Sequence, residues 1–114
     1  MNTLQDVIDV GIAFPERYGA GEFFVNGQPH CLVAKEVLSD VTPVREGDLD
    51  SMSLVGLAAA RLGCSREDVW DVVDWWDAMN GMRKNIERYR QVLLSKGYSV
   101  PFLMLGREHE VKET

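Results

Sequence analysis

The sequence predicts an α+β fold that is mainly α, with four to five helices and one small antiparallel hairpin. Two observations support this prediction. Apolar residues recur at helical spacing through most of the second half of the chain. In the first half, Asn26-Gly27, the strongest short hairpin signal, follows a run of strand-forming residues. The 114 residues are one domain's worth of chain, and we expect a single globular domain over residues 1–106 and a charged tail over residues 107–114.

Proline and glycine divide the first half into short elements. Thr3 is expected to cap a first helix together with Asp6, and Phe14-Pro15 is expected to end it. Residues 22–25 are predicted to form a strand, and Pro29 limits the strand that returns after the hairpin turn.

Two further segments complete the first half. Residues 31–38 have the spacing of a helix. Residues 42–50 contain Pro43, Gly47 and three acidic residues, and we expect a surface loop there.

The second half predicts a pair of helices joined at Gly63. The first helix is expected to begin at Asp50 or Ser51, with a left-handed glycine cap at Gly63; its apolar positions are Leu54, Leu57, Ala58 and Leu62. Ser65 then caps a second helix, whose expected core stripe is Val69, Val72, Val73 and Trp76. This αα-hairpin resembles a helix-turn-helix unit.

Beyond the second helix the pattern is less regular. Gly81 interrupts it, so the run to Lys96 is either a continuation through a kink or a separate helix. Residues 98–105 are rich in strand formers and are expected to pair with Phe23-Phe24.

The helix-turn-helix spacing raises the question of DNA binding. A helix that reads bases presents Arg, Lys, Asn or Gln near its N-terminus. The predicted outer face here is acidic and has Arg66 as its one basic residue; its acids are Glu67, Asp71, Asp74 and Asp77. A structural αα-hairpin is therefore favoured. Nucleic acid as a partner is disfavoured, and a DNA-binding regulator is kept as an alternative, in which phosphates would contact Arg83, Lys84, Arg88 and Arg90.

Charge is unevenly distributed along the chain. The net charge is −6, but residues 1–81 carry −9 and residues 82–114 carry +3. Two interpretations stay open: adjacent helices are simply complementary and solvated, or the acidic and basic faces meet a partner and steer association.

Three tryptophans within seven residues suggest an interface. Trp76 belongs to the core stripe, whereas Trp70 and Trp75 flank it beside the acidic face. Either neighbouring elements cover both rings, or the rings contact a partner, as tryptophan often does at binding hot spots.

No residue pattern predicts catalysis, a cofactor or a metal site. His30 and Cys31 are adjacent but have no third residue to orient them. The soft ligands do not have the close spacing of a zinc site; they are His30, Cys31, Cys64 and His109. We expect both cysteines to be free thiols.

Nothing predicts membrane insertion or secretion. The longest apolar run, residues 100–105, is far shorter than a membrane span and contains Pro101. Residues 1–10 are acidic, unlike a signal peptide. We therefore expect a cytoplasmic protein.

The segment from Arg17 to Val33 resembles a segment of small uncharacterised proteins of actinobacteria and their phages. Their Gly-x-Pro-small-Cys-Leu/Ile-Val-Gly core corresponds to residues 27–34 here, where His30 and Ala34 replace the usual Ser and Gly. The resemblance implies a phage or prophage origin, a host cytoplasm, and action by binding host machinery. It implies no catalytic residue.

Taken together, the sequence predicts a small non-enzymatic accessory protein that binds a host or phage protein and forms a homodimer. The expected contact residues are Trp70, Asp71, Asp74, Trp75 and Asp77. Besides the DNA-binding regulator, a weaker alternative is mimicry of nucleic acid by the acids Asp71, Asp74 and Asp77 together with residues 46–50.

Overall fold

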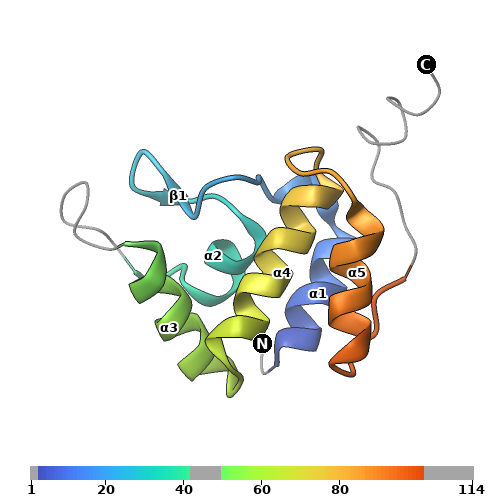
Figure 1. The fold of residues 1–114 in the computed structure, drawn as a ribbon. Helices are drawn as coiled ribbons and strands as arrows, with labels where there is room; N and C mark the ends of the chain where they lie inside the picture. The colour runs from blue at the N-terminus through green and yellow to red at the C-terminus, as the bar shows by residue number, and fades with distance from the viewer. Residues whose placement is uncertain (1–2, 42–49, 102–114) are drawn as a thin grey trace.

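Helix α4 (Arg66–Met79) lies at the centre of the fold, and helices α2 (Leu32–Val37), α3 (Ser51–Leu62) and α5 (Ile86–Ser95) pack against it (Figure 1). The computed structural model describes residues 3–41 and 50–101. These residues form five α-helices and a two-stranded antiparallel hairpin, which confirms the predicted fold class. None of the helices in the described ranges is long and apolar enough to cross a membrane.

The core is built on α4, where every predicted stripe residue is buried. Val69, Val72, Val73 and Trp76 are joined in the interior by Trp75 and Met79. Seven apolar side chains of this fourteen-residue helix are buried, so α4 makes contacts on most of its circumference.

Helix α1 (Leu4–Ala13) begins and ends as predicted. The Thr3 hydroxyl accepts from the Asp6 amide at 3.1 Å, and the Asp6 carboxylate accepts from the Thr3 amide at 3.1 Å, which is a complete capping box. Phe14 closes the helix, and Pro15 begins the short 3₁₀ helix η1 (Pro15–Arg17).

The predicted hairpin forms, but it is shorter than residues 22–25 suggested. Strand β1 (Phe24–Val25) pairs with β2 (Gln28–Pro29). Asn26 and Gly27 have φ of 52° and 77°, as a type I′ turn requires. Glu22 and Phe23 lie outside the strand, although the His30 amide still donates to the Phe23 carbonyl at 2.8 Å.

The α3–α4 pair has the predicted caps. The Asp50 carboxylate accepts from the Ser53 amide, Gly63 closes α3 at φ 67°, and the Ser65 hydroxyl accepts from the Asp68 amide. One assignment was wrong: Leu57 is 36% exposed. The other three apolar positions, Leu54, Ala58 and Leu62, are buried, and Val55 and Ala59 complete the covered side of α3.

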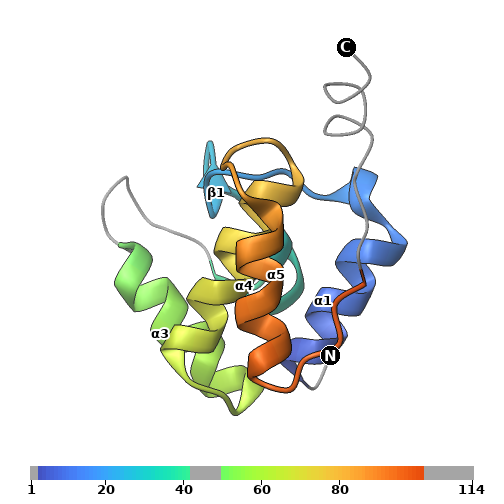
Figure 2. The same cartoon turned by 45° about the vertical axis from the view of Figure 1, so that its right-hand side comes forward.

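After α4, Gly81 at φ 79° and Asn85 at φ 64° separate α5 as a helix of its own. Residues 98–101 form no strand and do not pair with Phe23-Phe24 as predicted, and residues 102–105 of that predicted strand lie outside the described residues. Residues 98–101 run along α1 instead (Figure 2), where the Ser99 backbone exchanges two hydrogen bonds with the Gln5 side chain. Residues 42–49 and 102–114, which include the predicted loop and tail, lie outside the described residues.

Helix α1 approaches its neighbours closely at a buried glycine, and this generates a test. A Cβ at Gly11 would lie 2.6 Å from Leu32 Cδ2 and 3.1 Å from Trp76 Cζ3. Both side chains are fully packed, so we expect Gly11→Ala to destabilise the fold by about 1–3 kcal/mol, measured by urea unfolding.

The matched control is Gly56→Ala in α3. There the new Cβ would meet the guanidinium of exposed Arg66, which can move aside, and removing a helical glycine stabilises by about 0.5–1 kcal/mol. Equal effects of the two substitutions would contradict this account of the α1 contact.

Candidate functional site

The acidic side of α4 is neutralised at one end by α5. The Lys96 ammonium lies 2.5 Å from Glu67, 3.1 Å from Asp68 and 2.5 Å from Asp71. The Tyr98 hydroxyl donates to the second oxygen of Asp68 at 2.7 Å. Asp71, predicted as a partner contact, therefore holds α5 to α4 instead.

The other end of the same side is closed by the segment that follows α4. Arg83 lies 3.3 Å from the Asp74 carboxylate and 4.0 Å from that of Asp77. Asp77 is only 8% exposed, and its carboxylate accepts from the Gly21 amide at 3.0 Å. Both carboxylates serve contacts within the chain, and the burial of Asp77 leaves it little surface for the predicted partner contact.

This arrangement also removes the basis for nucleic-acid mimicry by the helix. A mimic needs several free carboxylates in a row, whereas Asp71, Asp74 and Asp77 each have an internal cation or amide donor. Residues 46–49 of the proposed mimic lie outside the described residues, and Asp50 caps α3.

The pKa values of these carboxyls are shifted in opposite directions at the two ends. Desolvation raises the pKa of Asp77, against the Gly21 hydrogen bond and Arg83, and it raises that of Asp74 against Arg83. Desolvation also acts on Asp68, but hydrogen bonds from Tyr98, Lys96 and Ser65 outweigh it and leave the Asp68 pKa lowered.

The tryptophans are covered by the fold itself. Trp75 is 0% exposed, so the prediction that it contacts a partner is corrected. Trp70 is half-buried and meets Phe23 edge-to-face, with ring centroids 6.1 Å apart. The hairpin supplies Phe23, and only the folded chain brings that loop to this flank of α4.

Among the four basic residues predicted to touch phosphates, two are engaged within the chain. Arg83 pairs with Asp74, and Arg90 binds Glu87 at 2.6 Å and the Val100 carbonyl at 2.8 Å. Lys84 and Arg88 are exposed and have no ion pair with any described residue. Helix α4, the predicted reader of bases, packs between α3 and α5 (Figure 2).

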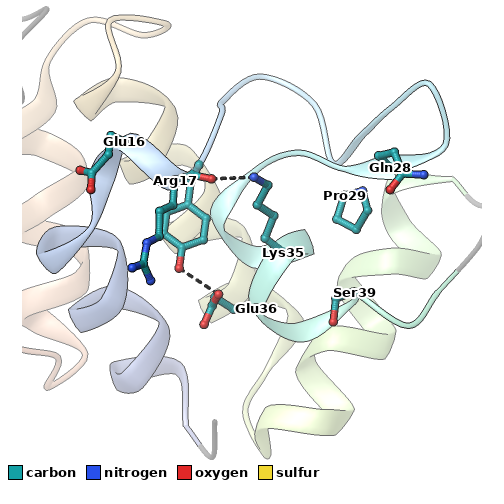
Figure 3. A pocket seen from close by; sticks show the side chains of 8 residues that line it. Glu16, Arg17, Gln28, Pro29, Lys35, Glu36 and Ser39 are labelled. Carbon is teal, nitrogen blue, oxygen red and sulfur yellow. Dashed lines mark hydrogen bonds between the residues drawn. The ribbon is translucent and has the colours of Figure 1, made fainter.

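An open groove of about 770 Å³ lies between η1, the hairpin and α2 (Figure 3). Its polar groups bind one another: the Tyr18 hydroxyl donates to Glu36 at 2.8 Å, and the Lys35 ammonium donates to the Arg17 carbonyl at 2.6 Å. Burial, and then the bond to Glu36, raises the pKa of Tyr18 to about 12, so this hydroxyl is a poor base at neutral pH.

Cys31 and His30 are the remaining residues that were considered for catalysis. Cys31 is buried at the start of α2, where burial raises the pKa of its thiol to about 11. The His30 imidazole lies against the backbone of Gly19. Both cysteines are free, as predicted, and no cluster of three or more metal-ligating side chains occurs within residues 3–41 and 50–101.

The surface that the sequence reasoning missed is the outer side of α3. Within an arc of about 140° of the helix, none of the exposed or partly exposed residues is charged; they are Met52, Ser53, Gly56, Leu57 and Ala60, and exposed Arg61, which binds Asp40, borders them. We call this set the α3 face. Met52 is 60% exposed. The available signal was the run from Ser51 to Ala60, ten residues without a charged side chain in a chain that is 26% charged.

No family model matches the chain, and neither a curated protein nor a solved structure is significantly similar to it.

The opposite pKa shifts on α4 predict opposite effects of two neutral substitutions. Because the folded pKa of Asp77 lies above 3.8, ionisation of Asp77 disfavours folding, and stability falls as pH rises through that pKa. The amide oxygen of an asparagine can still accept from the Gly21 amide. We therefore expect Asp77→Asn to raise the urea midpoint at neutral pH, and we expect the difference in midpoint from wild type to vanish below pH 4.

Asp68→Asn is the counterpart. The folded pKa of Asp68 lies below 3.8, so its contribution is present at neutral pH and is lost as pH falls through that value. We expect a lower urea midpoint than wild type at neutral pH and no difference in strong acid. Shifts of the same sign in both variants would show that this electrostatic account is wrong.

The packing of α4 leads us to expect no DNA binding. Duplex DNA titrated at low ionic strength should give no salt-dependent complex, because phosphate contacts need several free cations on one surface. A complex that weakens with salt and is lost in Lys84→Ala/Arg88→Ala would contradict this expectation.

Proposed function

We propose that this protein is a non-catalytic binding module that docks another protein chain on the α3 face. The observation that supports the proposal is the exposed side of α3 between Met52 and Ala60, which has no charged side chain. Apolar patches of this kind on folded domains are typical of protein contacts.

The position of α3 suits this role. It lies at the edge of the molecule (Figure 1), and its inner side is anchored by the buried residues Leu54, Val55 and Ala58. Arg61 fixes its far end through a two-point contact with Asp40, at 2.6 and 3.1 Å. A surface on such a rigid element loses little conformational freedom on binding.

The proposal keeps protein binding as the function and moves it from α4 to α3. The resemblance of residues 17–33 to proteins of actinobacteria and their phages fits an accessory protein that binds host machinery. The homodimer is retained as one form of this proposal, with a second copy on the α3 face, and the mass of the protein in solution measures it.

A charge placed on the α3 face tests the proposal. We expect Leu57→Glu to fold normally, because Leu57 is exposed, and to weaken partner binding at least about tenfold, since burying an unpaired carboxylate is unfavourable. Tagged protein is used to isolate partners from the cells that encode it. Each partner is then purified, and its affinity for wild type and variant is measured by calorimetry. Light scattering measures self-association.

Gln28→Glu, an exposed substitution on the hairpin, is the matched control. It should bind like wild type. If purified partners bind wild type, Leu57→Glu and Gln28→Glu equally, or if neither a partner nor a dimer is found, the α3 face is not a docking surface.

A further inference from the structure

The Arg66 guanidinium lies beside the α3 face and has no counterion among the described residues. Arg66 belongs to the first turn of α4, and a Cβ at Gly56 would lie 3.0 Å from its Nε and 3.2 Å from its Nη2. The guanidinium therefore rests on the α3 backbone, where Gly56 leaves room for it. Arg66 is exposed and forms no ion pair or hydrogen bond with any described residue.

The location of Arg66 does nothing for the stability of α4. A cation in the first turn of a helix is opposed by the helix dipole. The other two charged residues of this turn, Glu67 and Asp68, both bind Lys96. The Arg66 guanidinium thus keeps all five donors free beside an uncharged surface.

The shape of the α3 face suits a helix. The Arg66 guanidinium covers Gly56, and beside it Ala60 presents a small exposed side chain, with Met52 and Leu57 as apolar contacts on either side. Packed helices approach to about 8–10 Å, and small residues at the contact permit the shorter distances.

The charge of Arg66 decides which kind of partner fits the α3 face. A two-fold axis passing close to Arg66 would bring the two Arg66 side chains together, and like charges at an interface oppose association. Nucleic acid would need more free cations than Arg66 alone, because Arg61 on α3 is held by Asp40. A carboxylate from a different chain can bind the guanidinium through two parallel hydrogen bonds.

We infer that the α3 face receives an acidic amphipathic helix of another protein, with apolar side chains against Met52, Leu57 and Ala60 and an Asp or Glu paired with Arg66. This inference rests on the proposed function, and it specifies the chemistry of the partner. Arg66 then supplies orientation and specificity, and Met52 and Leu57 supply the apolar contact.

A displayed library of amphipathic helical peptides, randomised along the apolar stripe and its flanks, tests the inference. We expect selection on the wild-type protein to enrich peptides with an acidic residue at a fixed distance from the stripe. Their affinity should fall at least about tenfold with Arg66→Gln, the scale of a charge-assisted contact, and also with Leu57→Glu.

Charge reversal separates recognition from a structural role of Arg66. Arg66→Glu should lose the selected peptide and bind a peptide whose acid is replaced by Arg, while circular dichroism stays unchanged and the urea midpoint does not fall. Gln28→Glu, away from α3, should bind the original peptide like wild type.

Other results of these experiments would contradict this inference, the proposed function or both. If the selected peptides need Leu57 but neither Arg66 nor an acidic residue, this inference is wrong and the proposed function stands. The same holds if light scattering shows a dimer that Leu57→Glu dissociates. An oligonucleotide complex lost in Arg66→Gln would overturn the protein partner. Enriched peptides indifferent to Leu57→Glu, or a library without binders, would overturn both proposals.

Discussion

The Trp76 indole joins the two halves of the chain. Its Nε1 donates to the Gly19 carbonyl at 2.8 Å, across 57 positions of sequence, and its ring meets Tyr18 edge-to-face at 6.1 Å. An indole is largely apolar with one donor, so it can be buried at low cost only where that donor finds an acceptor. The Gly19 carbonyl meets this need and places the loop before the hairpin over the C-terminal part of α4.

The remaining contacts of α4 follow from that placement. With the loop held at Gly19, the Gly21 amide reaches the Asp77 carboxylate, and Phe23 reaches Trp70. On the opposite side, Lys96 binds carboxylates of α4. The carboxylates of α4 therefore hold its own neighbours, and the uncharged side of α3 is left to face outward.

This division explains the pattern of correct and incorrect predictions. Caps and turns depend on residues three or four positions apart, and these were predicted correctly at Thr3, Asn26-Gly27, Gly63 and Ser65. The contact residues on α4 were misassigned because exposure depends on what other segments cover. A helical projection places Trp75 beside an acidic face, but it contains no information about the elements that bury it.

The sequence by itself determined the fold class, the limits of most helices, the core stripe of α4 and the free thiols, because each follows from local spacing and side-chain chemistry. Tertiary structure alone decided which charges meet and which apolar residues stay outside. Lys96 finds Asp68 across 28 positions, Leu57 is left in solvent, and Arg66 comes to lie over Gly56. These are consequences of helix packing, in which a small rotation of a helix exchanges its buried and exposed positions.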